Sequence, residues 1–265
     1  MSQHRPADAT EAPDAPEAPR APEGGRALNV LVTGGSGASG VAVARALNQA
    51  GCRVFTVGSD RQRIEAAAQQ AGDGVTPLVC DLADLAAVRG LRETLAGTAG
   101  RMDAVIHLVG GWRGAKGIAD QDDADWDFLE RGAITTLRNV SRVFYDDLAA
   151  SGTGRFAMVS STAVDHPTAA TASYVAAKAA AETWTMAMAE GFGRTAPGTD
   201  GPGASPGSAA VVLVVKALVD ADLRRAHPER KFAGATDVED LAAAVIGLFS
   251  RPAAELNGRR LLLAT

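Results

Sequence analysis

Short apolar runs alternate along the chain with longer segments in which apolar residues recur every three or four positions. The runs are rich in β-branched residues and are typical of buried strands, whereas the longer segments are typical of amphipathic helices. The predicted strands cover residues 27–34, 52–58, 75–82, 102–111, 154–161, 209–218 and 258–265. The predicted helices cover residues 38–51, 60–72, 83–97, 122–151, 170–192 and 237–251.

This alternation predicts the fold class. Strands that are apolar throughout and separated by helices form parallel sheets that are buried on both faces. Right-handed crossovers then place helices on both sides of the sheet. We therefore predict an α/β fold with a single domain, built on a doubly wound, Rossmann-like parallel sheet of about seven strands.

Two segments do not follow the alternation. Residues 1–26 are rich in Pro, Ala and acidic residues and have no periodic apolar face, which predicts a disordered leader. Residues 194–209 are interrupted by Gly and Pro, which predicts a flexible surface insertion. The folded domain is therefore expected to cover residues 27–265.

Composition narrows the class of partner. The net charge is −5, and no basic stripe stands out of the kind that nucleic-acid-binding proteins usually show. No apolar run approaches the roughly 20 residues that span a bilayer, and the N-terminus lacks the apolar stretch of a secretory signal. We expect a cytoplasmic protein that binds neither nucleic acid nor membrane.

The two cysteines, Cys52 and Cys80, lie in or beside predicted strands and lack the spacing of metal ligands. We interpret both as small core residues and expect neither a metal site nor a disulfide.

The first predicted strand leads directly into a glycine-rich turn, TGGSGASG, at residues 33–40. Its glycines Gly34, Gly37 and Gly40 precede a predicted helix, so backbone N–H groups and the positive end of the helix dipole would meet a ligand there. Glycine also allows a pyrophosphate to approach closely. A tight turn without a ligand is the alternative, but the position in the first βα unit favours dinucleotide binding.

The end of the second strand bears on the choice of cofactor. Gly58 and Ser59 carry no carboxylate that would repel a 2′-phosphate, and Ser59, Arg61 and Arg63 are candidates to contact one. Asp60 stands where the dinucleotide fingerprint has a ribose-binding acid, but it also precedes a predicted helix and is a good N-cap. NADP(H) is therefore favoured over NAD(H).

Asp81 follows the third strand, at the carboxyl end where such sheets bind ligands. It is a candidate to accept a hydrogen bond from adenine. A turn or cap role is the alternative, with Asp84 competing for the cap of the next helix.

Tyr174 and Lys178 stand four residues apart on the predicted helix 170–192, in a stretch otherwise rich in alanine. Residues at this spacing share one helix face, so the two side chains project together. Tyr174 is one of only two tyrosines in the chain, and a core or interface role is its alternative.

These motifs, in this order, resemble those of the short-chain dehydrogenase/reductase family, over residues 28–264. TGGSGASG resembles the nucleotide turn of that family in its TGxxGxxG form, and CDL resembles its adenine-contacting Asp. HLVGG, residues 107–111, stands where the family has Asn-Asn-Ala-Gly. VSS followed by YVAAK resembles the catalytic Ser and the Tyr-x-x-x-Lys pair; Ser161 lies 13 residues before Tyr174, the family's usual separation, which favours it over Ser160.

The resemblance implies an NAD(P)(H)-dependent oxidoreductase that reduces a carbonyl or oxidises a secondary alcohol. Tyr174 would be the acid/base, Lys178 would lower the pKa of the tyrosine and hold the nicotinamide ribose, and Ser161 would polarise the carbonyl. A homodimer or homotetramer, paired through the helix of Tyr174 and Lys178 and the one before it, is implied as well. The implied cofactor-binding residues are Thr33, Gly34, Ser36, Gly37, Ala38, Gly40, Ser59, Asp60, Arg61, Asp81, Leu82, Leu108, Val109, Gly110, Tyr174 and Lys178.

The chain also departs from the family pattern. Ala133 stands where the family has an asparagine that supports a water relay, Lys216-Ala217 replaces Pro-Gly, and Ala221 falls at a nicotinamide-contacting Thr. Thr135 or Thr136 would be the only nearby substitutes for the relay. These departures favour an alternative function, a nucleotide-binding sensor or regulatory protein with weak or no turnover.

Three further side chains are expected near the cofactor or the substrate. His107 is expected to be neutral and hydrogen-bonded to backbone. Trp112 would stack on a flat substrate and Arg113 would meet an anionic one, unless this loop packs onto the surface.

Overall fold

The computed structural model describes residues 26–194 and 207–263. The predicted leader, except Arg26, and residues 195–206 of the predicted insertion lie outside the described residues. Arg194 is the last residue of a helix and Ala209 the first of a strand, so the insertion is shorter than predicted at both ends.

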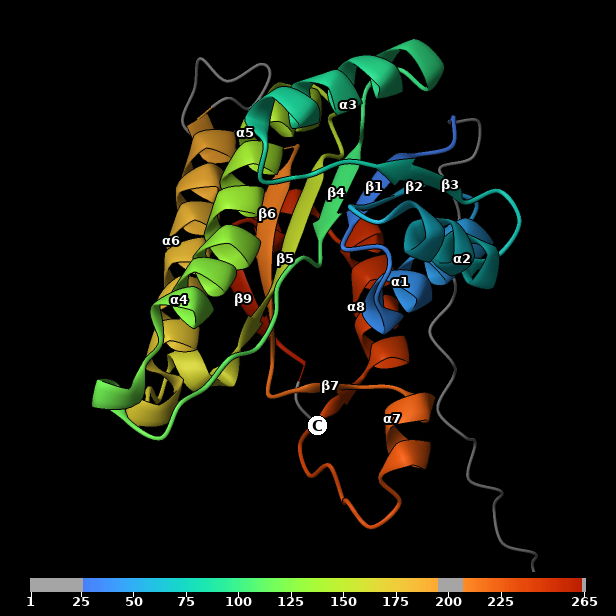
Figure 1. The fold of residues 1–265 in the computed structure, drawn as a ribbon. Helices are drawn as coiled ribbons and strands as arrows, with labels where there is room; N and C mark the ends of the chain where they lie inside the picture. Colours follow the sequence, from blue (N-terminus) through green and yellow to red (C-terminus); the bar gives the residue numbers. More distant parts are fainter. Residues whose placement is uncertain (1–25, 195–206, 264–265) are drawn as a thin grey trace, which may run out of the picture.

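Seven parallel strands form one sheet in the order β3-β2-β1-β4-β5-β6-β9, as predicted (Figure 1). β1, β2 and β3 follow one another toward one edge of the sheet. The chain then returns to pair β4 with the other side of β1, and β5, β6 and β9 continue toward the opposite edge. The point of reversal lies between β1 and β4, where such sheets bind ligands. The strands are β1 (Asn29–Thr33), β2 (Arg53–Gly58), β3 (Thr76–Val79), β4 (Ala104–His107), β5 (Arg155–Ser161), β6 (Ala209–Val215) and β9 (Arg259–Leu262).

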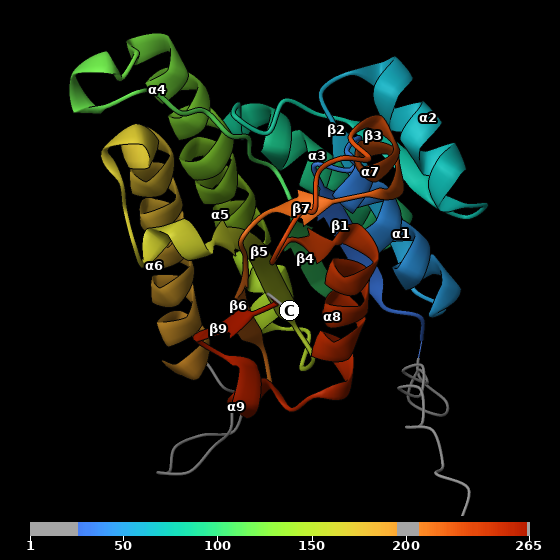
Figure 2. The same cartoon turned by 90° about the horizontal axis from the view of Figure 1, so that it is seen from below.

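Helices cover both faces of the sheet (Figures 1 and 2). Successive residues of β1 show why: Val30 and Val32 enter one apolar core and Leu31 enters the other, because side chains alternate along a strand. One core is covered by α1 (Ala38–Gln49), α2 (Arg61–Ala71) and α8 (Val238–Ser250). The other is covered by α3 (Leu85–Thr98), α5 (Thr136–Ala149) and α6 (Ala172–Arg194).

The predicted helix 122–151 is not continuous. It consists of α4 (Asp123–Leu129), a π-helical turn η2 (Glu130–Thr135) and α5. A π turn differs from an α-helical turn in its hydrogen bonds, which run from i to i+5, and the hydrophobic pattern did not predict it. The described residues between β4 and α6 also contain three 3₁₀ turns: η1 (Ile118–Asp120), η3 (Thr162–Val164) and η4 (Ala169–Thr171).

The segment after β6 forms a small unit that the hydrophobic pattern did not predict. β7 (Leu218–Val219) pairs in parallel with β8 (Thr236–Asp237), and α7 (Ala221–Ala226) lies between them in sequence. Figure 1 shows β7 and α7 beyond the carboxyl end of β6. The short helix α9 (Ala253–Leu256) then leads into β9.

The predicted helix caps and core cysteines are observed. The Asp60 carboxylate accepts the amide N–H of Arg63 at 2.8 Å and caps α2, and Asp84 caps α3 in the same way. Burial raises the pKa of both thiols, Cys52 and Cys80, to about 11, so neither is a reactive thiolate at neutral pH. Among the described residues, none of the helices combines the length and apolar character that crossing a bilayer requires.

Candidate active site

The glycine turn joins β1 to α1, and its three glycines serve different purposes. Gly34 has a φ of +75°, and a Cβ there would lie 2.8 Å from the backbone of Leu108. A Cβ at Gly40 would lie 2.6 Å from the carbonyl oxygen of Gly34. Gly37 has open space instead, its nearest neighbour being 3.8 Å away. Two glycines therefore allow the turn to close, and the third leaves its outer side open.

That open side has unused hydrogen-bond donors. Gly37 is the N-cap of α1 and provides no side-chain cap, so the first N–H groups of the helix are left for a ligand. The hydroxyl of Ser36 is buried beside it and has no hydrogen-bond partner among the described residues. These donors and the positive end of the helix suit the oxygens of a pyrophosphate.

A cleft of about 550 Å³ adjoins this turn at the carboxyl ends of β1 to β4. Arg63, a candidate for the 2′-phosphate, also lines it. Ten of the predicted cofactor-binding residues line the cleft: Gly34, Ser36, Gly37, Ser59, Asp60, Asp81, Leu82, Leu108, Val109 and Gly110.

Six predicted cofactor residues do not line this cleft, and two of them, Tyr174 and Lys178, line a second cavity described below. Thr33 is fully buried, Ala38 lies at the exposed start of α1, and Gly40 packs against the turn. Arg61 points to the surface and pairs with Glu65 at 3.3 Å, because the two are one helical turn apart. Arg63, two residues later, is the arginine of α2 that reaches the cleft.

Asp81 makes two contacts within the protein. Its carboxylate accepts the amide N–H of Ala83 at 3.0 Å, which is the turn role left open by the sequence. It also pairs at 2.6 Å with Arg131, a cleft residue that the sequence analysis did not identify. Because Arg131 lies 50 residues further along the chain, on the π turn, no local pattern links the two. Thr136, Phe128 and Gly132 line the cleft from the same region and were missed for the same reason.

A second cavity of about 390 Å³ lies on the other side of the end of β4. It shares Leu108, Val109 and Gly110 with the cleft, so the two spaces lie next to each other. Tyr174, Lys178, Trp112, Ser160 and Lys216 are among its lining residues. Together the two spaces suit an extended ligand whose ends have different surroundings.

The fold brings the three predicted catalytic residues together. Tyr174 and Lys178 occupy successive turns at the start of α6, and Ser161 ends β5. The Ser161 hydroxyl lies close enough to the Tyr174 hydroxyl to lower the pKa of that phenol, and Ser161 also accepts the amide N–H of Ala163 at 3.2 Å. Lys178 is buried and donates a hydrogen bond of 2.9 Å to the carbonyl oxygen of Val159.

The electrostatics of the pair differ from the prediction. Burial raises the pKa of Tyr174, and the nearby Ser161 hydroxyl only partly offsets this effect. Burial also lowers the pKa of Lys178 to about 8, against the negative charge of Glu182. The ammonium donates to the backbone of Val159, so the predicted lowering of the tyrosine pKa by Lys178 is not seen in this structure.

His107 is buried and neutral, as predicted. Burial, with a smaller contribution from Lys178, lowers its pKa to about 3. Its partners are two hydroxyls rather than backbone: Thr33 Oγ1 lies 2.8 Å from Nδ1, and Thr136 Oγ1 lies 3.2 Å from Nε2. Thr136 donates its own proton to the carbonyl oxygen of Gly132. The network therefore assigns the ring proton to Nε2, with Thr33 donating to Nδ1.

Apolar packing replaces the relay asparagine. Ala133 is buried with Leu129 and Ala177 beside Tyr174. Thr135 donates to the Glu130 carboxylate at 2.6 Å, and Thr136 is engaged with Gly132 and His107. Neither threonine makes a hydrogen bond to Lys178 among those observed.

Trp112 and Arg113, the two predicted substrate contacts in the loop after β4, differ in whether their side chains are free to bind a substrate. Trp112 lines the second cavity and is 64% exposed, so its ring is free to meet a ligand. Arg113 pairs with Asp125 at 3.1 Å and lies 3.9 Å over the ring of Phe128. The guanidinium is thus occupied within the protein.

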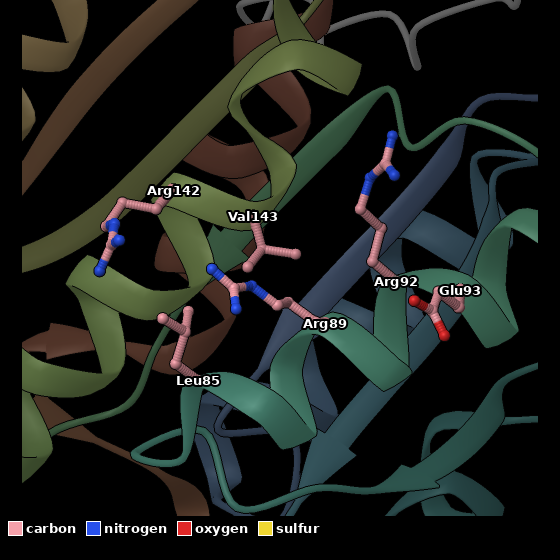
Figure 3. Close-up of a pocket in the computed structure, with 6 residues that line it drawn as sticks. All are labelled: Leu85, Arg89, Arg92, Glu93, Arg142 and Val143. Atoms are coloured by element: carbon pink, nitrogen blue, oxygen red, sulfur yellow. The ribbon is translucent and has the colours of Figure 1, made fainter.

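A separate hollow of about 270 Å³ lies between α3 and α5 (Figure 3). Arg89 extends from α3 toward Val143, while Arg92 and Arg142 point away from each other. It shares no lining residue with either space described above. It is therefore not part of this site.

Comparison with known sequences decides the family. The sequence profile of the family named short chain dehydrogenase matches residues 28–196. The chain belongs to this family. It is thus a short-chain dehydrogenase/reductase, an oxidoreductase of a family that uses NAD(P) and acts on small molecules.

Relatives of this short-chain dehydrogenase are distant in sequence. Gluconate 5-dehydrogenase of Gluconobacter oxydans is 26% identical over 237 residues, covering 88% of this chain and 91% of the relative. A short chain oxidoreductase of Pseudomonas aeruginosa PAO1, which contains an atypical catalytic center, has a TM-score of 0.76 at 20% identity, over 89% of this chain and 95% of that one. Gluconate 5-dehydrogenase of Burkholderia cenocepacia, in complex with NADP and tartrate, has a TM-score of 0.73 at 22% identity, over 89% and 92%. These two structures share the fold.

Proposed function

We propose that this enzyme reduces a carbonyl compound, or oxidises the corresponding secondary alcohol, with NADP(H) as the favoured cofactor. One observation carries the proposal: the Tyr174 hydroxyl lies beside Ser161, one helical turn from Lys178, at a cavity that adjoins the glycine-turn cleft. The bound nicotinamide would supply the hydride. The protein would supply the remaining requirements, which are positioning, a proton and stabilisation of negative charge.

Each of the three side chains has a distinct task in this proposal. The Ser161 hydroxyl donates a hydrogen bond to the carbonyl oxygen, as in an oxyanion hole. Tyr174, like any phenol, is protonated at neutral pH and would act as the acid toward a developing alkoxide. Burial raises its pKa and so makes it a weaker acid than a free tyrosine. Lys178, held at the end of β5 by Val159, provides positive charge beside that oxygen and would hold the ribose of the cofactor.

The cleft supports the choice of cofactor. The open glycine turn fits a pyrophosphate, and Ser59 and Arg63 line the same cleft, where a 2′-phosphate would need donors and positive charge. Solved proteins of the same fold carry NADPH or NADP, and a xylitol dehydrogenase carries NAD⁺, so the choice rests on the residues of the cleft. These observations favour NADP(H), although Asp60 contributes a carboxylate to the same wall.

Turnover with a matched tyrosine control tests this proposal. NADPH and NADH are titrated by fluorescence, and ketones, quinones and acyl thioesters are then screened as substrates. We expect NADPH to bind more tightly than NADH, and Tyr174→Phe to lose turnover while keeping NADPH affinity. Tyr145→Phe is the control, because Tyr145 stacks on Phe192 away from both cavities. Binding of NADPH without turnover of any carbonyl would favour the sensor function.

We also propose a homodimer or homotetramer. A groove of about 430 Å³ between α5 and α6 is lined by Tyr145, Trp184 and Met188 among others. Trp184 is partly exposed there and donates a hydrogen bond to Ser141 at 2.9 Å. Sedimentation analysis of the purified protein measures the state directly, and a monomer would contradict the proposal.

A further inference from the structure

The end of β6 places a lysine in the wall of the second cavity. Lys216 occupies the position where the family has the proline of Pro-Gly, and it lines this cavity with Tyr174, Lys178 and Trp112. The cavity is lined by two cationic residues, Lys178 and Lys216, and by no carboxylate among the described residues. Lys178 already serves the reacting end of the site, so the second charge requires its own explanation.

The ammonium of Lys216 has no acidic partner among the described residues. Its Nζ donates one hydrogen bond of 2.8 Å, to the carbonyl oxygen of Ala233, and an ammonium has three donors. The acids of the segment after β6 are all engaged elsewhere. Asp220 caps α7, Asp222 pairs with Arg225, Glu229 with His227 and Asp237 with Arg224.

The side chain of Lys216 is also held in place. A Cβ at Gly234 would lie 3.3 Å from Lys216 Cδ, so the loop between α7 and β8 approaches the aliphatic part of the side chain closely. Lys216 is exposed, and the bond to Ala233 restrains its ammonium at the cavity wall. A charge restrained by such a bond loses less entropy on binding a ligand than an unrestrained lysine does.

We propose that Lys216 determines substrate specificity by binding an anionic oxygen group of the substrate. The substrate class is then a carbonyl compound, or its alcohol, that carries a carboxylate. This proposal rests on the proposed function, because it places the substrate in the cavity of Tyr174. A phosphate oxygen of the cofactor has the same chemistry as such a group, so the test must separate the two sources.

The test measures binding without turnover, using pairs of probes that differ only in charge. The pairs are pyruvate and methyl pyruvate, acetoacetate and methyl acetoacetate, and 4-carboxybenzaldehyde and its methyl ester. Calorimetry is carried out with the protein saturated with NADP⁺, which cannot reduce a carbonyl. We compare the unaltered protein with Lys216→Gln and with Lys231→Gln, a lysine of the same segment that does not line the cavity.

We expect the unaltered protein and Lys231→Gln to bind at least one acid about tenfold more tightly than its ester, the effect of one charged hydrogen bond. Lys216→Gln should lose this preference and keep its affinity for NADP⁺. Equal binding of acids and esters by the unaltered protein, binding of no acid, or an unchanged preference in Lys216→Gln would each overturn the proposal. Weaker NADP⁺ binding by Lys216→Gln with the acid preference intact would overturn it too, by assigning the lysine to the cofactor.

Turnover is a separate readout in the same experiment. If the acids bind through Lys216 but NADPH reduces none of them, the proposed catalysis fails while the binding site stands. If reduction occurs equally well with acids and esters, the proposed catalysis stands and the role of Lys216 fails.

Discussion

Lys178 donates a hydrogen bond of 2.9 Å to the carbonyl oxygen of Val159. The bond joins the helix that carries Tyr174 to the strand that carries Ser161, and it brings a buried ammonium to the end of β5. Burial lowers the pKa of this lysine, and the nearby Glu182 opposes the shift. Glu182 is itself held by Arg260, at 2.8 Å.

This arrangement predicts the alkaline side of the pH profile. A lysine with a pKa of about 8 loses its proton, and its charge, as the pH rises through 8. We therefore expect kcat/KM for carbonyl reduction to fall above about pH 8. Glu182→Gln removes the negative charge that raises this pKa, so the fall should shift to lower pH.

The control for this prediction is Glu190→Gln, on the exposed side of the same helix, where Glu190 pairs with Arg194. It should leave the pH profile unchanged. Thermal unfolding of both variants shows whether the fold is intact. A Glu182→Gln profile that coincides with that of the unaltered protein would show that Glu182 does not tune Lys178.

The two serines at the end of β5 are predicted to have unequal roles. The Ser161 hydroxyl lies close enough to Tyr174 to lower the pKa of its phenol, whereas the Ser160 hydroxyl is buried without a partner among the described residues. We expect Ser161→Ala to lower kcat by about 100-fold, the typical cost of losing one oxyanion-hole donor. Ser160→Ala should have little effect. Steady-state kinetics of both variants on one substrate measure the two values of kcat. A larger loss of kcat in Ser160→Ala than in Ser161→Ala would assign the oxyanion-hole role to Ser160.

Two neighbouring arginines of α2 predict where cofactor selectivity arises. Arg63 lines the cleft, whereas Arg61 pairs with Glu65 outside it. Arg63→Gln should weaken NADPH binding by about tenfold, the effect of one charged hydrogen bond to phosphate, and should spare NADH. Arg61→Gln should change neither affinity. If Arg63→Gln weakens both cofactors equally, the side chain does not contact the 2′-phosphate.

Two glycines of the first turn predict different losses. Gly34→Ala should destabilise the fold by more than about 1 kcal/mol, because its φ of +75° is left-handed and the added Cβ would meet the backbone of Leu108. Gly37→Val should keep the fold and weaken NADPH binding, because the side chain would enter the open side of the turn. Thermal unfolding and NADPH titration of each variant separate the two effects. If Gly37→Val left the affinity for NADPH unchanged, Gly37 would not face the cofactor.

The sequence by itself determined the sheet, the glycine turn and the spacing of Tyr174 and Lys178. Each depends on local periodicity: continuously apolar runs specify strands buried on both faces, and an i, i+4 pair specifies one helix face. The same locality accounts for the Asp60 and Asp84 caps, which bond within the next three residues.

Only the tertiary structure decided which groups meet across the sheet. The Asp81–Arg131 pair, the bonds of two hydroxyls to His107 and the Lys216–Ala233 hydrogen bond all join residues that are separated in the sequence. The pKa of Tyr174 belongs here as well: spacing places an ammonium nearby, but burial and the hydrogen bonds of the folded chain set the direction of the shift. Such contacts depend on how loops and helix ends pack in three dimensions, and hydrophobic periodicity carries no information about that packing.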